Sequence, residues 1–329
     1  MNSQRTTIPP PHIGMFVVPA ADIDLESSLD GGQAFRWWQE ADGYRGVIGD
    51  RAVHLSAVDG GIQVELVGDG RVEGLVGEVR DYLGLGYDMS SFREAFSDDP
   101  CIGPALRGYH GLRLLRQDPW ECLVSFICSA TSNIPRIKLN VGSVATTLGT
   151  RVGPGERDFA FPAPSVVAEA GEARLRTLGL GFRAKFVALA AETVASGRLD
   201  LMSLRSATYV EAREALTALH GVGEKIADCV LAFSLDKPES FPVDRWTRRA
   251  LEKWYGLPAG HNNTKASEWA RAIFRGHGAV AQQYMFHRER LLGRAQAWGG
   301  KHVERALDED AAVLGVERAQ RDSSAAASE

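Results

Sequence analysis

The chain has 329 residues, of which 44% are hydrophobic and 24% are charged, and its formal net charge is -5. This composition is typical of a globular protein, and the length predicts a substantial core divided between two or three domains or lobes. The sequence has no apolar run long enough to cross a bilayer, and residues 1–20 lack the basic start and apolar centre of a signal peptide. We therefore expect a cytoplasmic or nuclear protein that does not bind membranes.

The negative charge is concentrated at the C-terminal end. Residues 303–329 include seven acidic and three basic residues, which leaves the rest of the chain near neutrality. DNA-binding domains are usually basic, so the overall charge argues weakly against a nucleic-acid partner. Local basic clusters, such as Arg245 with Arg248 and Arg249, are equally well explained as solvated faces. Charge alone permits DNA binding without indicating it.

The cysteines do not indicate a metal site or a disulfide framework. There are four, at positions 101, 122, 128 and 229, and their spacing is irregular. Zinc and iron–sulfur sites built from cysteine need ligands at short, recurring spacings. We therefore predict no bound metal and no cofactor.

The N-terminal part of the chain is predicted to form an antiparallel sheet. Residues 1–11 are polar and proline-rich and read as a flexible arm, and strand and turn patterns follow up to about residue 70. Val53 and Leu55 alternate with polar residues, as do Ile62 and Val64, and the turn sequence Asp-Gly-Gly at 59–61 lies between the two runs. This predicts a β-hairpin in a sheet domain that spans, with flanking helices, residues 12–105.

The pattern becomes helical from about residue 72. Leu75 and Val79 recur on one face, and apolar residues keep helical spacing through residues 134–148. Further helices are predicted at residues 209–219, 224–235 and 245–255. The fold class is therefore α+β, with the antiparallel sheet domain followed by an all-helical domain over residues 106–302 and an acidic, disordered tail at 303–329.

Two of these helices meet at a glycine turn within residues 209–235. Residues 219–229 read LHGVGEKIADC, so that Gly221, Val222 and Gly223 separate the two helices. Glycine permits left-handed or crowded backbone conformations, and the absence of side chains leaves the first amides of the second helix open to an anion. The turn is therefore a candidate phosphate-binding site.

Lys225 lies in the first turn of the second helix, where the macrodipole disfavours a cation. Partial desolvation would act in the same direction, and both effects favour the neutral amine, which is the form that attacks carbon. Asp244, 19 residues later, is a candidate carboxylate partner and also has the position of an N-cap for the helix at 245–255. From local sequence alone, a solvated surface lysine and a simple helix cap remain open as alternatives.

These residues together resemble a known family. The segment HGVGEKIADC, followed by Asp244 at the end of a Pro-Val-Asp sequence, is similar to the helix-hairpin-helix DNA glycosylase superfamily, and more narrowly to the 8-oxoguanine DNA glycosylases of the eukaryotic type. The resemblance implies that Lys225 is a nucleophile that forms a Schiff base and that Asp244 assists it. The four-cysteine iron–sulfur loop of the related endonuclease III has no counterpart here, and the hairpin is a candidate site for a monovalent cation.

The resemblance also implies a base pocket. The sequence GQAFRW at 32–37 is similar to the GQ-x-FRW segment of the family, whose glycine carbonyl accepts the additional hydrogen on N7 of 8-oxoguanine, a role that falls on Gly32. Phe286 and Cys229 would lie against the two faces of the flipped base, and Gln282 would face its Watson–Crick edge. Local sequence alone explains Gly32 as a turn residue and Cys229 and Phe286 as core residues.

A further set of residues would contact the DNA around the flipped nucleotide. The resemblance places Phe182 as a wedge between bases, Arg183 at the orphaned cytosine and Arg245 at the phosphates, together with the three hairpin residues. The loop that fills the space of the expelled base contains Thr131, Asn133 and Arg136. Two positions depart from the family, which usually has Asn at position 131 and His at the position of Trp246. Threonine has no amide group, so the resemblance does not imply strict preference for cytosine opposite the lesion.

As a whole, the resemblance implies a monomeric, bifunctional DNA glycosylase and AP lyase that excises 8-oxoguanine, or a related oxidised purine, from duplex DNA in base excision repair. Two alternatives remain open. One is a glycosylase for alkylated purines, for which the lysine would be unnecessary, and the other is a non-catalytic helix-hairpin-helix module that binds DNA backbones. The sequence does not determine the lesion preference, the opposite base, the strength of the lyase step or the protein partners.

Overall fold

The computed structural model describes residues 14–20, 22–68 and 70–298, with side chains described up to residue 293. The expected N-terminal arm at 1–11 and the expected tail at 303–329 lie outside the described residues. Within the described part of the chain, none of the helices has the length and apolar character needed to cross a membrane.

The N-terminal region forms a five-stranded antiparallel sheet with the strand order β1-β5-β4-β3-β2. The strands are Met15–Pro19, Trp37–Gln39, Tyr44–Ile48, Arg51–Val58 and Gly61–Leu66, numbered β1 to β5. Leu55 of β4 pairs with Val64 of β5, and the turn between these strands contains Gly60 with a φ of 75°. The predicted hairpin is therefore confirmed, because the turn sequence and the alternation of apolar residues specify the same register.

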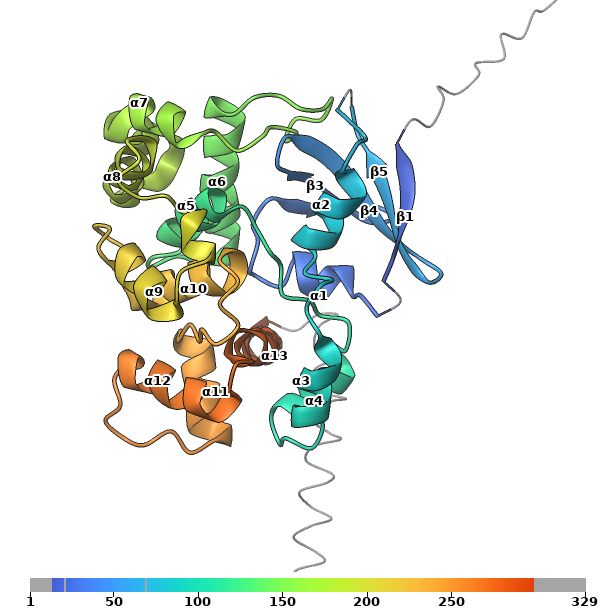
Figure 1. Cartoon of the computed structure of the whole chain (residues 1–329), viewed down its shortest axis with the longest axis vertical. Helices are drawn as coiled ribbons and strands as arrows, with labels where there is room; N and C mark the ends of the chain where they lie inside the picture. Colours follow the sequence, from blue (N-terminus) through green and yellow to red (C-terminus); the bar gives the residue numbers. More distant parts are fainter. Residues whose placement is uncertain (1–13, 21, 69, 299–329) are drawn as a thin grey trace, which may run out of the picture.

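One face of the sheet is covered by helices α1 (Leu25–Leu29) and α2 (Leu75–Tyr82) (Figure 1). The predicted apolar face of α2 is confirmed, since Leu75 and Val79 are fully buried in the core of this layer. Trp37 of β2 donates a hydrogen bond from Nε1 to the hydroxyl of Tyr82 at 2.8 Å. This bond pairs the indole N–H of the buried Trp37 and connects β2 to the last residue of α2.

The central core lies between six helices that follow the sheet. They are α5 (Pro119–Cys128), α6 (Ile134–Leu148), α7 (Pro164–Leu175), α8 (Arg183–Ala195), α9 (Tyr209–Thr217) and α10 (Glu224–Ser234), with the π-helical segment Arg176–Leu180 before α8 and the short 3-10 helix Ser203–Arg205 before α9. Helix α10 packs on α5, where the rings of Phe126 and Phe233 stack with centroids 5.4 Å apart. The helices predicted at 134–148, 209–219 and 224–235 correspond to α6, α9 and α10.

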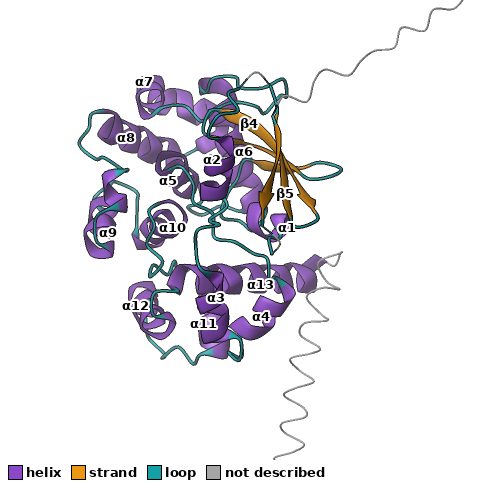
Figure 2. Ribbon diagram, turned by 45° about the vertical axis from the view of Figure 1, so that its right-hand side comes forward, coloured by secondary structure: helices purple, strands orange, loops and turns teal. Residues whose placement is uncertain are grey.

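A separate core at the C-terminal end contains helices α11 (Arg245–Trp254), α12 (Asn263–Phe274) and α13 (Gly278–Trp298). Helices α3 (Met89–Phe96) and α4 (Ile102–Gly108) contribute to the same core (Figure 2). Arg288 of α13, for example, donates a hydrogen bond to the carbonyl oxygen of Cys101 at 3.3 Å. The expectation that residues 12–105 form one unit around the sheet therefore needs correction, because the apolar faces of α3 and α4 are buried against helices about 150 residues later in the chain.

Candidate active site

The turn between α9 and α10 depends on Gly221. Its φ is 87°, and a Cβ at this position would lie 2.3 Å from Cγ of Phe186 on α8. Only glycine satisfies both the left-handed backbone and the close approach of the ring. Gly223 is the N-cap of α10, no side chain caps that end, and Val222 is buried beneath the turn. The amide of Val222 donates to the carbonyl of Leu219 at 3.0 Å, whereas the first amides of α10 have no side-chain cap and are available to an anion. The phosphate-binding role of Gly221, Val222 and Gly223 stays a prediction.

Lys225 is half-buried and its amine lies against α5. Nζ is 3.4 Å from Oγ of Ser129, which follows α5, and 5.2 Å from the centroid of the Phe126 ring. Neither neighbour was singled out from the sequence, because both lie in a segment that reads as core. The simple surface-lysine alternative is therefore disfavoured, since the amine packs on a protein face.

Asp244 is the N-cap of α11, as predicted. Its Oδ1 accepts hydrogen bonds from the backbone amides of Trp246 and Thr247, both at 2.9 Å, and from the Thr247 hydroxyl at 3.1 Å. The same hydroxyl lies 2.9 Å from the Asp244 amide, which completes a capping box. All three bonds to the carboxylate go to Oδ1, so Oδ2 receives no hydrogen bond from the described residues.

Cys229 is a buried thiol on α10, one turn after Lys225. Burial raises the pKa of its thiol to about 12, the nearby Lys225 lowers it, and Asp244 raises it. Lys225 and Cys229 share α10, whereas Asp244 acts on the thiol from the start of α11. The thiol remains protonated at neutral pH and presents a small, weakly polar surface.

Gly32 and Phe286, which are 254 positions apart, are in contact. Gly32 has a φ of 84°, and a Cβ there would lie 2.9 Å from Cε1 of Phe286 and 2.9 Å from Cδ1 of Ile134. A neighbouring residue of α13, Gln283, donates a hydrogen bond from Nε2 to the carbonyl of Gly31 at 3.1 Å. The turn is thus held against α13, and no local sequence pattern indicated the role of Gln283.

The turn that presents Gly32 is fixed by Gln33 from the other side. The fully buried amide of Gln33 donates to the carbonyls of Ser28 at 3.0 Å and Arg113 at 2.8 Å, and its Oε1 accepts from the amide of Leu115 at 2.9 Å. A buried polar side chain with every group paired is a rigid support. The second residue of the GQ sequence therefore has a structural role beside Gly32.

Gln282 lies on α13 one turn before Phe286. Its side chain is 4% exposed, and its Oε1 has no hydrogen-bond partner among the described residues. A buried amide oxygen without a partner is costly unless a ligand supplies a donor. The predicted role of Gln282 at the edge of a base has this observation in its support.

The predicted wedge is exposed beside the hairpin. The Phe182 ring is 49% exposed, and it contacts Phe186, which packs in turn on His220. Arg183 is buried and donates hydrogen bonds to the carbonyls of Ala130 at 2.7 Å and Thr131 at 2.9 Å. Arg183 therefore holds the loop before α6, and its contact with the orphaned base stays a prediction.

The other predicted DNA contacts lie at the starts of two helices. Asn133 caps α6 by accepting from the amide of Arg136 at 3.0 Å, and the Arg136 side chain is exposed. The Trp246 ring packs against α13, where a Cβ on Gly293 would come within 2.4 Å of it, and the guanidinium carbon of Arg245 lies 4.5 Å from the indole centroid. Their roles in DNA binding stay predictions.

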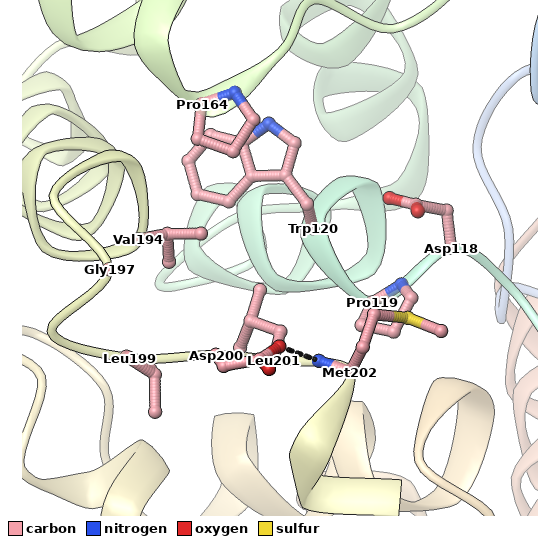
Figure 3. Close-up of a pocket in the computed structure, with 10 residues that line it drawn as sticks. All are labelled: Asp118, Pro119, Trp120, Pro164, Val194, Gly197, Leu199, Asp200, Leu201 and Met202. Atoms are coloured by element: carbon pink, nitrogen blue, oxygen red, sulfur yellow. Dashed lines mark hydrogen bonds between the residues drawn. The ribbon is translucent and has the colours of Figure 1, made fainter.

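A groove of about 530 Å³ is formed between α5, α7 and the segment after α8 (Figure 3). Its lining includes Trp120, Pro164, Leu201 and Met202. None of the candidate residues lines this groove. It lies at the first turn of α5, whereas Lys225 contacts Phe126 in the last turn, about 9 Å further along the helix axis at 1.5 Å per residue.

Comparison with known proteins agrees with this geometry. A family model described as the N-terminal domain of 8-oxoguanine DNA glycosylase matches residues 15–123. The N-glycosylase/DNA lyase OGG1 of Arabidopsis thaliana is 35% identical over 288 residues, which cover 84% of this chain and 76% of the plant protein. The chain belongs to the 8-oxoguanine DNA glycosylase family.

Solved structures of 8-oxoguanine DNA glycosylases show the same fold over most of the chain. The structure of MBOgg1 in complex with a low-affinity DNA ligand matches with a TM-score of 0.79 and 32% identity, over 85% of this chain and 96% of that one. The 8-oxoguanine glycosylase/lyase of Clostridium acetobutylicum, in complex with double-stranded DNA containing cytosine opposite 8-oxoG, matches with a TM-score of 0.78 and 29% identity, over 83% and 93%. The family and the α+β fold predicted from sequence are confirmed.

Proposed function

We propose that the protein excises 8-oxoguanine from duplex DNA and then cleaves the strand at the abasic site, as a bifunctional glycosylase and AP lyase of base excision repair. The observation that carries the proposal is the placement of the Lys225 amine on a protein face at the start of the second hairpin helix, 3.4 Å from Oγ of Ser129 and 5.2 Å from the centroid of the Phe126 ring. A non-catalytic DNA-binding module needs a glycine hairpin but has no use for an amine packed on a protein face. The names of the relatives, which are glycosylase/lyases, support the same activity.

Base recognition begins with the unpaired Oε1 of Gln282. The Watson–Crick edge of a guanine offers N–H donors to such an acceptor, and an adenine offers fewer. The ring of Phe286 supplies a stacking surface, and the carbonyl of Gly32 accepts the N7 hydrogen that 8-oxoguanine has and guanine lacks. Groups that are satisfied only by the correct base discriminate strongly, because the wrong base leaves them unpaired.

Excision then proceeds through the amine of Lys225. The amine attacks C1′ of the flipped nucleotide, the glycosidic bond breaks, and its electron pair leaves with the base, which takes up a proton. Positive charge develops on the sugar as the bond breaks, and Oδ2 of Asp244 stabilises it. Opening of the sugar ring gives the Schiff base, and loss of a proton from C2′ then expels the 3′ phosphate by β-elimination.

The remaining groups serve to extrude and hold the nucleotide. Phe182, exposed beside the hairpin, enters the stack and offsets the few kcal/mol that unstacking requires. The free amides at the start of α10 bind a phosphate of the DNA, and the positive charge of Arg245 attracts the backbone of the same DNA strand. The protein acts as a monomer and without an iron–sulfur cluster, and the hairpin stays a candidate site for a monovalent cation. With Thr131 in place of an amide side chain, it tolerates bases other than cytosine opposite the lesion.

Borohydride trapping tests the proposed chemistry. Incubation of the wild-type protein with a duplex containing 8-oxoguanine in the presence of borohydride should give a covalent protein–DNA adduct, because borohydride reduces the Schiff base. Lys225→Gln should give none, while it retains binding to the same duplex. Arg176→Gln, which changes an exposed residue outside the site, is the matched control and should trap like wild type. Equal trapping by Lys225→Gln would rule out Lys225 as the nucleophile.

A panel of duplexes then defines the substrate. Rates of strand cleavage with 8-oxoguanine opposite each of the four bases measure the effect of Thr131. Duplexes that carry an alkylated purine test the alternative substrate class. Faster cleavage of an alkylated purine than of 8-oxoguanine would overturn the proposed lesion.

A further inference from the structure

Asp228 is a buried carboxylate that the proposed chemistry does not use. It lies on α10 one turn after Lys225 and is 1% exposed. Oδ1 accepts a hydrogen bond from the hydroxyl of Tyr209 on α9 at 2.8 Å, and Oδ2 accepts one from Oγ of Ser267 on α12 at 3.2 Å. The carboxylate thus joins both helices of the hairpin to a third helix from the C-terminal core.

Ser267 continues this connection to the catalytic aspartate. Its Oγ lies 2.8 Å from the carbonyl oxygen of Phe241, which precedes Asp244 by three residues. Residues 241–243 are buried and lead directly into the cap of α11. A continuous path of two hydrogen bonds therefore runs from the helix that carries Lys225 to the segment that carries Asp244.

We propose that Asp228 and Ser267 are positioning residues, which set the place of Asp244 relative to Lys225 by linking α10 to residues 241–243. The inference rests on the proposed function for its catalytic consequence, although the mechanical link stands on the contacts alone. A displacement of about 1 Å between reacting groups lowers a catalysed rate by as much as 10²-fold, so a link of this kind acts on the rate and leaves DNA binding largely intact.

Because the Ser267 hydroxyl has a single hydrogen, the link depends on whether Asp228 is protonated. A hydroxyl has one hydrogen, yet Ser267 has two acceptors within reach, Oδ2 of Asp228 and the carbonyl of Phe241. When Asp228 is ionised, one of these contacts has no hydrogen. When Asp228 is protonated, its own O–H donates to Ser267, which donates to Phe241, and the chain of hydrogen bonds is complete.

Burial raises the pKa of Asp228 to about 6, against the hydrogen bonds and the positive charge that lower it. The charged and titratable groups around it are Tyr209 and Arg213 on α9, Glu224 on α10 and Arg271 on α12. Arg213 lies 3.5 Å from Oδ1 but also 3.2 Å from Glu224, so its charge is shared between two carboxylates. The complete chain of hydrogen bonds therefore forms as the pH falls through about 6.

The first test separates positioning from general stability. Ser267→Ala should lower the single-turnover rate of 8-oxoguanine excision about tenfold or more, with the dissociation constant for the lesion duplex changed by less than about twofold. The matched control is Ser234→Ala, because Ser234 is also a buried helical serine, but its hydroxyl donates to the carbonyl of Val230 on its own helix and contacts the thiol of Cys122 on α5, so it does not link α10 to residues 241–243. Ser234→Ala should excise at the wild-type rate. An unchanged rate in Ser267→Ala, or an equal loss in both variants, would overturn the positioning role.

The second test does not depend on activity. Hydrogen exchange of the amides in residues 241–247 should be faster in Ser267→Ala than in wild type and unchanged in Ser234→Ala, since only the first variant cuts the link. If exchange is faster in Ser267→Ala but the wild-type protein excises no 8-oxoguanine, the proposed function is refuted and the link is retained. Unchanged exchange would refute the link, whatever the activity.

The third test addresses protonation. Asp228→Asn imitates the protonated carboxyl group, because its amide donates to Ser267 and its oxygen accepts from Tyr209. The ratio of its excision rate to the wild-type rate should rise about threefold or more between pH 5 and pH 7.5, with a midpoint near pH 6. A ratio that is constant over this range would overturn the protonation part of the inference.

Discussion

The side chain of Asp244 divides its two oxygens between folding and the proposed chemistry. Oδ1 accepts all three hydrogen bonds that cap α11, which fixes the carboxylate in one orientation. Oδ2 is left for the developing charge on the sugar. A group that is already oriented needs no reorganisation when the transition state forms. Electrostatic stabilisation by such a preorganised group is therefore large. The cap is therefore part of the proposed site as well as a local stabiliser.

Asp244→Asn tests this division of roles. Asparagine is as good an N-cap as aspartate, so the free energy of unfolding should change by less than about 0.5 kcal/mol. The excision rate should fall by about 10² to 10⁴, because the neutral amide cannot stabilise the sugar cation or accept a proton. Single-turnover kinetics and duplex binding by the same preparation give both quantities. A variant that keeps the wild-type rate would restrict Asp244 to its role as a cap.

At the scale of elements, the hairpin is positioned by packing on α8. The ring of Phe186 fills the space in front of Gly221 and contacts His220 and Phe182 on either side. One aromatic side chain thus contacts both the proposed wedge and the phosphate-binding turn, after which the helix of Lys225 begins. A change at the turn should propagate to both the lysine and the wedge.

Gly221→Ala should be destabilising through two causes. The left-handed backbone costs a Cβ-bearing residue about 1 to 2 kcal/mol, and the added carbon would displace the Phe186 ring. We expect a loss of at least about 2 kcal/mol in the free energy of unfolding, measured with urea, together with weaker binding of duplex DNA. Gly142→Ala in α6 is the control, because its Cβ would meet open space in a helix, where alanine is favoured by up to about 1 kcal/mol. Equal stabilities for the two variants would contradict this account of the turn.

At the scale of the whole molecule, three cores meet around the site. The hairpin belongs to the central core, Asp244 and Gln282 belong to elements of the C-terminal core, and the Gly32 turn lies next to the sheet. Arg36 is one of the connections between layers, since it forms a two-pronged ion pair with Glu121 of α5 at 2.7 and 2.6 Å and donates to the carbonyl of Phe159 at 2.6 Å. The site exists only while these layers remain docked.

Arg36→Met should undock the sheet layer in part. The guanidinium is 2% exposed, so its removal leaves a partly buried carboxylate and a buried carbonyl without their donors. We expect a loss of about 3 kcal/mol or more in the free energy of unfolding, as is typical when one partner of a buried pair is removed. Arg176→Met removes the exposed pair with Glu172 and should cost less than about 0.5 kcal/mol. Thermal and urea unfolding measure both, and a small loss in Arg36→Met would show that other contacts suffice to dock the sheet.

Local patterns determined much of the fold in advance. The β4–β5 hairpin, the apolar face of α2, helix α6 and the capped start of α11 depend on residues a few positions apart, and a turn sequence, a helical period or a capping side chain is sufficient to specify them. The sequence also identified Lys225, Asp244 and Gly32 as candidates, because their motifs are compact and ordered along the chain.

The contacts between these candidates were decided by the tertiary structure. Gln283 on the Gly31 carbonyl, Ser129 beside Lys225 and the path through Asp228 and Ser267 join residues that are 26 to 252 positions apart. The assignment of α3 and α4 to the C-terminal core has the same origin. The sequence of an amphipathic helix predicts that one face will be buried. Which element covers that face depends on how all the layers pack together, and no local pattern contains that information.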